Sequence, residues 1–182
     1  MIYPGKQMEE KALLDTAARM CVAARTAPKS RGIDEVLSLV LTGEDKDRLA
    51  DQVDEIGRRD FGEEASVWYG RDAQNVRDAG AVVLLGMEKT YRGVARCSFC
   101  GFEDCNACKE AGGHCAFLYT DLGIALSSAV MVAAQDQVDN RIMWSVGKAA
   151  AELKLGKEDI FWIGIPLSVA GKNIFFDRQV KR

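Results

Sequence analysis

Five of the six cysteines in this chain lie within nineteen residues, in the segment CSFCGFEDCNACKEAGGHC. Two cysteines separated by two residues can direct both thiolates to one metal centre, and a glycine after the second permits the required turn. The segment therefore predicts a cysteine-ligated centre. Its cysteines are Cys97, Cys100, Cys105, Cys108 and Cys115.

The nature of the centre follows from ligand type and spacing. The run from Cys100 to Cys108 has the C-x4-C-x2-C order of a plant-type ferredoxin loop, with further cysteines flanking it closely on both sides. Zinc would accept four of these thiolates. Five cysteines in a glycine-containing, aromatic-flanked loop exceed what zinc needs, so we interpret the segment as an iron–sulfur site, such as 4Fe–4S. Zinc is the alternative, and thiol or disulfide chemistry comes third.

The identity of the fourth ligand is left open by the spacing. Three cysteines are expected to be ligands in either case: Cys97, Cys100 and Cys105. A helix starting after Asp104 would place Cys108 one turn from Cys105, where it could face the centre or only pack. Cys115 follows two glycines that would let it return to the site, so we prefer Cys115. His114, the only histidine, is expected to be an ordinary loop residue.

Composition argues against several classes of protein. The chain of 182 residues is 48% hydrophobic and 28% charged, which is typical of one globular domain spanning 1–182. A net charge of -3 and a pI near 5.3 do not supply the positive field that nucleic acids and anionic membranes attract. The N-terminus lacks signal-peptide features, and the apolar stretch 117–134 contains an aspartate and two serines, which favours a buried helix over a membrane span. We expect a cytoplasmic protein, in which clustered cysteines favour metal or redox chemistry.

Elements on both sides of the cysteine segment must position it. Apolar runs between turn residues predict three strands: 36–42, 81–86 and 160–166. Helical periodicity predicts four helices: 6–26, one beginning after Thr42, 121–135 and 147–155. Helices and strands mix without βαβ alternation, so the predicted class is α+β, with helices flanking a central sheet and 97–115 forming a cysteine-rich loop within the domain.

One resemblance lies in and after the cysteine segment. The stretch CSFCGFEDCNACKEAGGHCAFLYTDLGIALSSAV, followed by DNRIMWSVGKAA, resembles a family of uncharacterised prokaryotic proteins described as containing a ferredoxin domain. That family carries a CxxCG…C…C loop running into a DLGIA helix and then DNR. The resemblance implies a redox protein with an iron–sulfur cluster.

A second resemblance spans most of the chain. The stretch TAPKSRGIDEVLSLVLTGEDKDRLAD is similar to the nitroreductase stretch in which a helix ends at an A-P-S turn and a strand follows. TDLGIALSSAVMVAAQ resembles the long central helix of that fold, and DIFWIGIPLSV followed by Arg178 resembles its closing strand and terminal arginine. The resemblance implies a nitroreductase-like mixed or antiparallel sheet, a homodimer, and FMN at the subunit interface. The positions that match its FMN contacts are Lys29, Ser30, Arg31 and Arg178.

Two functions follow as hypotheses. The first is an FMN-dependent oxidoreductase in which a cysteine-bound cluster exchanges electrons with the flavin and with an unknown redox partner. The second is a non-enzymatic iron–sulfur or zinc protein that acts as an electron carrier or redox sensor, because no arginine-rich R-S-x-R segment precedes Arg19. No histidine lies near a serine or an isolated cysteine, which argues against a hydrolase.

Overall fold

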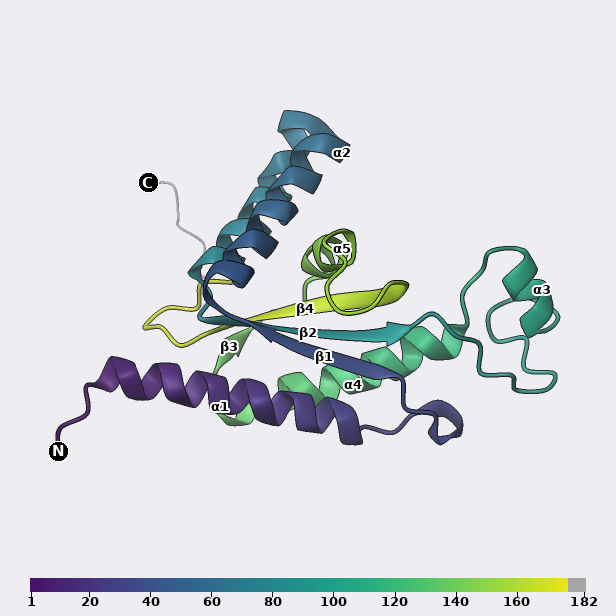
Figure 1. Ribbon diagram of the computed structural model, residues 1–182, viewed down its shortest axis with the longest axis horizontal. Helices are drawn as coiled ribbons and strands as arrows, with labels where there is room; N and C mark the ends of the chain where they lie inside the picture. The colour runs from purple at the N-terminus through teal and green to yellow at the C-terminus, as the bar shows by residue number, and fades with distance from the viewer. Residues whose placement is uncertain (177–182) are drawn as a thin grey trace.

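The computed structural model describes residues 1–176, apart from 63–67, and contains an antiparallel sheet between two layers of helices (Figure 1). In chain order the elements are α1 Gly5–Thr26, the 3-10 turn η1 Ser30–Gly32, β1 Val36–Leu41, α2 Gly43–Asp78, β2 Ala81–Glu88, α3 Cys105–Glu110, α4 Ala116–Gln135, β3 Asp139–Asn140, α5 Trp144–Glu152 and β4 Ile160–Ser168. The strand order is β1-β2-β4-β3, with every neighbouring pair antiparallel. The predicted α+β class and all three predicted strands are confirmed.

The core consists of two hydrophobic clusters on opposite faces of the sheet. On β2, Val83 and Leu85 face the side covered by α1 and α4, whereas Val82 and Leu84 face the side covered by α2 and α5. All four side chains are fully buried. This alternation explains why β2 reads as a continuous apolar run, because both of its faces are covered.

Helix α4 forms part of the core below the sheet. Its length and its mean hydropathy of 1.6 are those of a helix that could cross a membrane, yet Leu122, Ala125 and Ala129 pack against α1 and the sheet, as the sequence predicts for a buried helix. Only 39% of its most apolar window is buried. The opposite side of α4 exposes Ile124 and Met131.

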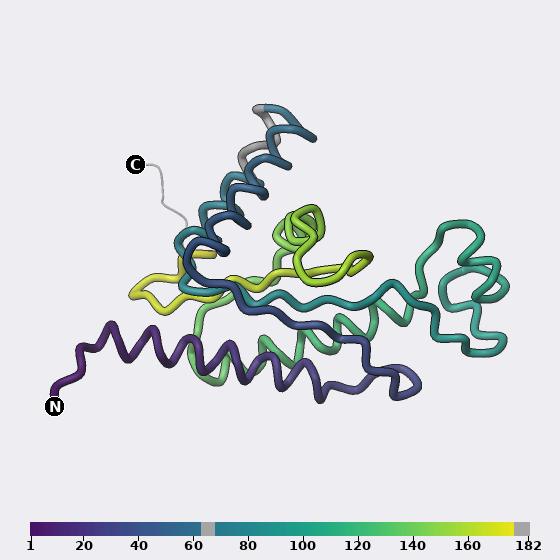
Figure 2. The backbone as a smooth tube through the Cα atoms, viewed as in Figure 1, coloured from purple at the N-terminus to yellow at the C-terminus, as the bar shows by residue number. Residues whose placement is uncertain are grey.

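Helix α2 is a helical hairpin, and its path is followed most easily in the backbone tube (Figure 2). The helical geometry breaks at Gly62, whose φ of 67° is readily adopted only by glycine. The two arms lie against each other: the buried Lys46 Nζ donates to the carbonyls of Val76 and Arg77 at 3.1 and 2.8 Å. A cation at these carbonyls stabilises the C-terminal end of the second arm.

Two helices begin earlier than the sequence predicts. Helix α4 starts at Ala116, because the aromatic-rich turn before Asp121 also packs inward and buries Leu118. Helix α5 starts at Trp144, so Gly147 lies in its middle rather than at its start. A Cβ at Gly147 would lie 1.9 Å from the carbonyl oxygen of Trp162. The glycine is therefore required by the close approach of α5 to β4, which local sequence does not reveal.

Strand β4 continues through Pro166 instead of ending there. The N–H of Gly164 points away from β2 and donates to Met143. Because the direction of the N–H alternates along a strand, Pro166 also has its nitrogen on that side. The missing N–H thus removes no hydrogen bond from the β2–β4 ladder.

Candidate metal centre

The five clustered cysteines lie in a lobe that projects from one end of the sheet, between the end of β2 and the start of α4 (Figure 1). The lobe contains one short helix, α3. Asp104 is its N-cap, and its Oδ1 accepts a hydrogen bond of 2.8 Å from the N–H of Ala107. The cap starts the helix so that Cys105 and Cys108 are one turn apart, as the sequence predicts.

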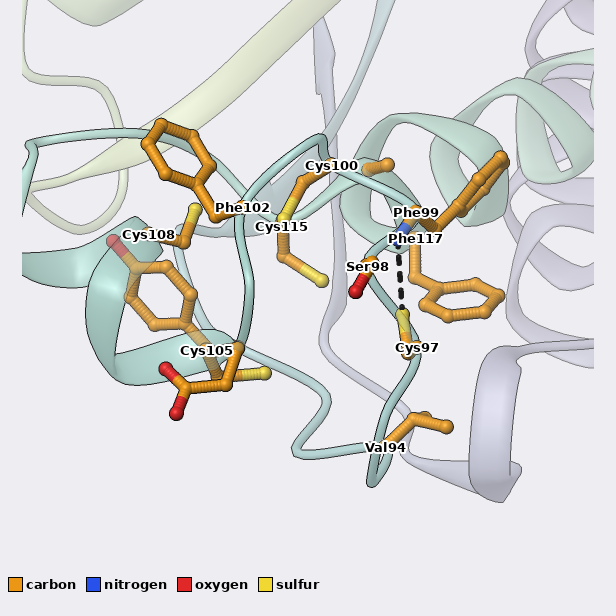
Figure 3. A pocket seen from close by; sticks show the side chains of 13 residues that line it. Val94, Cys97, Ser98, Phe99, Cys100, Phe102, Cys105, Cys108, Cys115 and Phe117 are labelled. Carbon is orange, nitrogen blue, oxygen red and sulfur yellow. Dashed lines mark hydrogen bonds between the residues drawn. The ribbon is translucent and has the colours of Figure 1, made fainter.

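All five thiols line one pocket (Figure 3). Cys108 and Cys115 are buried, and the other three are half-buried. The two candidates for the fourth ligand, Cys108 and Cys115, are therefore both buried, and their roles as ligands stay predictions. Cys97 stands in the first stem of the loop, where its Sγ accepts a hydrogen bond of 3.4 Å from the N–H of Phe99.

The rest of the pocket wall is mostly apolar. Phe99 and Phe117 pack with their ring centroids 5.3 Å apart, and Phe102 joins them at the wall. The hydroxyl of Tyr91 donates to the carbonyl of Gly113 at 2.8 Å, which ties the two sides of the lobe together. Such walls limit the access of water to the sulfur atoms, one of the factors that sets the potential of a thiolate-bound cluster.

The neighbouring thiols of the pocket affect the pKa of Cys108. Burial raises the pKa of the Cys108 thiol to about 11, and a hydrogen bond with Cys100 and the nearness of Cys115 and Cys105 add to the shift. The Cys108 thiol is therefore protonated at neutral pH in the absence of a cation. A bound metal would supply the compensating positive charge, because ligating thiols are deprotonated.

The sulfur atoms surround the pocket rather than meet at one point. In residues 1–176 apart from 63–67, no three Cys, His, Asp or Glu side chains converge closely enough to hold a single metal ion. The space between the pocket walls is about 10 Å3, room for about one water molecule. The thiol donors fit a cluster chemically, and a multi-iron cluster would need the thiols that line this narrow space to move outward. Gly101 and Gly112, both at positive φ, are loop positions with wide backbone freedom.

His114 lies next to Cys115 but is exposed, as expected for an ordinary loop residue. Its ring packs edge-on against Tyr119, with the centroids 5.9 Å apart. Tyr119 in turn contacts Phe161 of β4 at 4.9 Å. The histidine therefore belongs to an aromatic contact beside the pocket.

The predicted flavin contacts lie in the turn after α1, and most of their donors are already engaged. Lys29 Nζ donates to the carbonyls of Ala24 and Ala27 at 3.0 and 2.8 Å, and also to that of Arg25, so it caps the end of α1. The ammonium has three hydrogens, and all three have acceptors. A flavin phosphate would have to displace these contacts, so Lys29 does not fit the role as it stands.

The other two residues of the turn point toward the cysteine lobe. The N–H and hydroxyl of Ser30 both donate to Asp121 of α4. Arg31 Nη1 donates to the carbonyls of Arg92 and Gly93, at 2.6 and 3.3 Å. The fourth predicted contact, Arg178, lies outside the described residues. The turn therefore binds protein groups at the positions where the resemblance places a phosphate.

A buried charged network next to this turn was missed by the sequence reasoning. Arg92 and Asp121 are almost fully buried and form an ion pair, and Arg92 also contacts Glu35. Burial lowers the pKa of Arg92, but the hydrogen bonds to Glu35 and Asp121 outweigh it and raise that pKa overall, so the guanidinium stays charged. The available signal was Asp121 itself, the one charged residue in the helix 116–135. A charge buried in an apolar helix needs a partner.

Comparison with known proteins gives one family model and several relatives. The model described as "Uncharacterized protein containing a ferredoxin domain (DUF2148)" matches residues 111–178, a segment that includes Cys115 and begins after Cys108. An uncharacterized protein of Archaeoglobus fulgidus is 36% identical over 193 residues, covering 100% of both chains.

Among solved structures, the chain is similar in fold to nitroreductase-like proteins. A BluB-like flavoprotein of Clostridium difficile 630 aligns with a TM-score of 0.63 at 16% identity, covering 92% of this chain and 84% of the other. A protein described as a "putative nitroreductase in complex with fmn" from Desulfovibrio desulfuricans aligns with a TM-score of 0.56 at 17% identity, covering 92% of this chain and 80% of the other. The predicted nitroreductase-like fold is confirmed.

Proposed function

Because the chain belongs to the family of uncharacterized proteins containing a ferredoxin domain, we propose that it is an electron-transfer protein that binds an iron–sulfur cluster in its cysteine lobe. The observation that carries the proposal is the position of five thiols around one sheltered, aromatic-walled pocket. Four thiolates are the usual ligand set of such a cluster, so one of the five is in excess. The bound cluster would supply one-electron chemistry, which no side chain of the lobe offers at neutral pH.

The residues of the lobe have distinct parts in this proposal. The Asp104 cap orients Cys105 and Cys108 by starting α3. Phe99, Phe102 and other aromatic residues shield the sulfur atoms from water. Zinc is the alternative occupant, because it also accepts four thiolates. The C-x4-C-x2-C spacing from Cys100 to Cys108, which is that of a plant-type ferredoxin loop, favours the cluster.

The proposal is tested by anaerobic purification followed by iron, sulfide, zinc and flavin analysis of the same sample. We expect iron and acid-labile sulfide in comparable amounts, with a broad visible absorption that bleaches on reduction. A colourless sample with one zinc per chain would refute the proposal. Cys100→Ser should lose most of its iron, whereas Cys21→Ser, in which the altered cysteine lies in α1 far along the chain, should keep it.

A flavin is the second candidate cofactor, favoured by the FMN complex of a protein with the same fold. The contacts of Lys29 and Ser30 weigh against phosphate binding at this turn. We therefore propose an electron carrier or redox sensor first and an FMN-dependent oxidoreductase second. Stoichiometric FMN in the purified sample, retained through dialysis, would reverse this order.

We also propose that the chain forms a homodimer through the uncovered side of α4. That side carries Ile124 and Met131 and no charged side chain, since the one charged residue of α4, Asp121, is buried. An apolar helix face of this length is expected to be covered by a second copy. Sedimentation should show a dimer that Met131→Glu dissociates, whereas Val40→Glu, on the exposed side of β1, leaves it intact. A monomeric wild-type protein would refute the proposal.

A further inference from the structure

The two ends of the cysteine loop are joined by a buried ion pair. Arg92 precedes the first cysteine of the loop, and Asp121 follows the last one. The Nε and Nη2 atoms of Arg92 both donate to Oδ2 of Asp121, at 3.2 and 3.1 Å. Both side chains are 2% exposed. The pair therefore sets the separation of the two stems from which the lobe projects.

The same pair is bound to the body of the domain. Arg92 Nη1 donates to Glu35, just before β1, and to the hydroxyl of Thr90 at 3.1 Å. On the other side, Asp121 Oδ1 accepts from the hydroxyl of Ser30 at 2.7 Å. The guanidinium thus bridges three acceptors in fixed directions, which a planar, forked cation can do and a lysine ammonium cannot.

The turn after α1 holds both stems of the loop. Ser30 binds the second stem through Asp121, and Arg31 binds the first stem through the carbonyls of Arg92 and Gly93. Ser30 and Arg31, two of the residues that the resemblance assigns to a flavin, therefore have another role in this chain. They hold the lobe against α1 and the sheet.

A buried ion pair is weak evidence for a contribution to stability, because removing two charges from water costs as much as their attraction returns. Two apolar side chains of similar volume would serve stability at least as well. A role in fixing the relative position of the two stems explains such a pair better, because a guanidinium and a carboxylate form good hydrogen bonds in only a few geometries.

We propose that Arg92 and Asp121 are positioning residues for the cysteine pocket, which hold the stem carrying Cys115 at the separation from the first stem that the proposed cluster requires. The inference rests on the proposed function for its purpose. The structural part of the inference is that the pair keeps the lobe closed over the thiols, and this part applies equally to the metal-free protein. The two parts are therefore tested by separate measurements.

The first measurement follows thiol protection in metal-free, folded protein. Samples are treated with N-ethylmaleimide, and the rate at which each cysteine is modified is read by mass spectrometry. Asp121→Asn should speed modification of the buried Cys108 and Cys115 by about tenfold or more, because the buried guanidinium of Arg92 loses one of its two carboxylate partners, which favours the open loop. The rate at Cys21, in α1, should not change.

The matched control is Asp54→Asn, which removes an ion pair of 2.6 Å with Arg77 between the arms of α2. It should leave the rates at Cys108 and Cys115 within twofold of wild type. Equal rates in Asp121→Asn and wild type would overturn the inference. So would a comparable acceleration in Asp54→Asn, because the effect would then be general destabilisation.

Two further variants keep the test decisive if Asp121→Asn does not fold. Arg92→Lys keeps the positive charge but loses the planar set of guanidinium donors. Ser30→Ala removes only one hydrogen-bond donor to Asp121. Both should accelerate modification of Cys115, the second by a smaller factor of about threefold. Full protection in Arg92→Lys would show that charge alone suffices and would overturn a role in positioning.

The second measurement is iron and sulfide content after anaerobic reconstitution. Asp121→Asn should take up less than half of the wild-type iron and show an altered visible spectrum, whereas Asp54→Asn matches wild type. If wild-type protein takes up no iron, the proposed function fails and the labelling rates still decide whether the pair closes the lobe. Equal iron and an identical spectrum in Asp121→Asn would overturn the positioning role.

Discussion

Gly113→Ala tests whether the packing of the cysteine pocket is as tight as the structure implies. A Cβ at this position would lie 2.8 Å from Cε2 of Phe102, 3.0 Å from Sγ of Cys108 and 3.1 Å from the Cys108 carbonyl oxygen. The Gly113 N–H also donates to that carbonyl at 2.8 Å, so the backbone cannot simply move away. The added methyl group must displace the ring, the sulfur, or both.

The magnitude follows from the cost of overpacking, about 1–3 kcal/mol when a methyl group is forced into a filled site. For a chain of this size, that cost lowers the Tm by at most about 2–4 °C per kcal/mol. The larger consequence is expected in metal binding, because Cys108 Sγ moves. Reconstituted Gly113→Ala should hold less than half of the wild-type iron.

Gly112→Ala is the matched control for this prediction. Gly112 has a φ of 68°, and a Cβ there meets nothing within 4 Å. Its cost is backbone strain of about 1–3 kcal/mol, similar in size to that of Gly113→Ala but without contact to a cysteine. Thermal unfolding and iron analysis of both variants separate the two effects. Wild-type iron content in Gly113→Ala, or equal loss in both variants, would refute the reasoning.

Two further predictions concern the rest of the domain. Gly147→Ala should lower the free energy of unfolding by about 3 kcal/mol and the Tm by about 6–12 °C, because its Cβ would lie 1.9 Å from the carbonyl oxygen of Trp162. An unchanged Tm would contradict the packing of α5 on β4. Hydrogen bonds from Arg59 and then Lys148 lower the pKa of Asp60 to about 2, so this carboxylate stabilises the fold above its unfolded pKa and loses that effect as the pH falls from about 4 to 2. The decline of Tm over this range should be shallower in Asp60→Asn, and an identical decline would show that the contacts do not form in solution.

Local patterns were sufficient for most of the architecture. The strands β1, β2 and β4 and the helix α1 were predictable because their apolar periodicity reports burial directly. The start of α5 was not, because Gly147 reads as a helix boundary in the sequence but is needed in mid-helix for contact with Trp162. The continuation of β4 past Pro166 likewise depended on which neighbour the proline nitrogen faces.

Some features of the candidate site could likewise be predicted from the sequence, and others could not. Five soft ligands within nineteen residues can meet without help from distant parts of the chain, so a shared cysteine site could be predicted from residue type and short spacing alone. The contacts of Ser30 and Arg31 could not be predicted from residue type and spacing. They meet Asp121 and Arg92 across 91 and 61 positions of the chain, and such contacts exist only after α1, α4 and the sheet have packed. The sequence alone thus determined which chemistry the lobe can support. Tertiary structure decided that the turn after α1 binds protein groups rather than standing free for a phosphate, because packing alone brings distant donors and acceptors together.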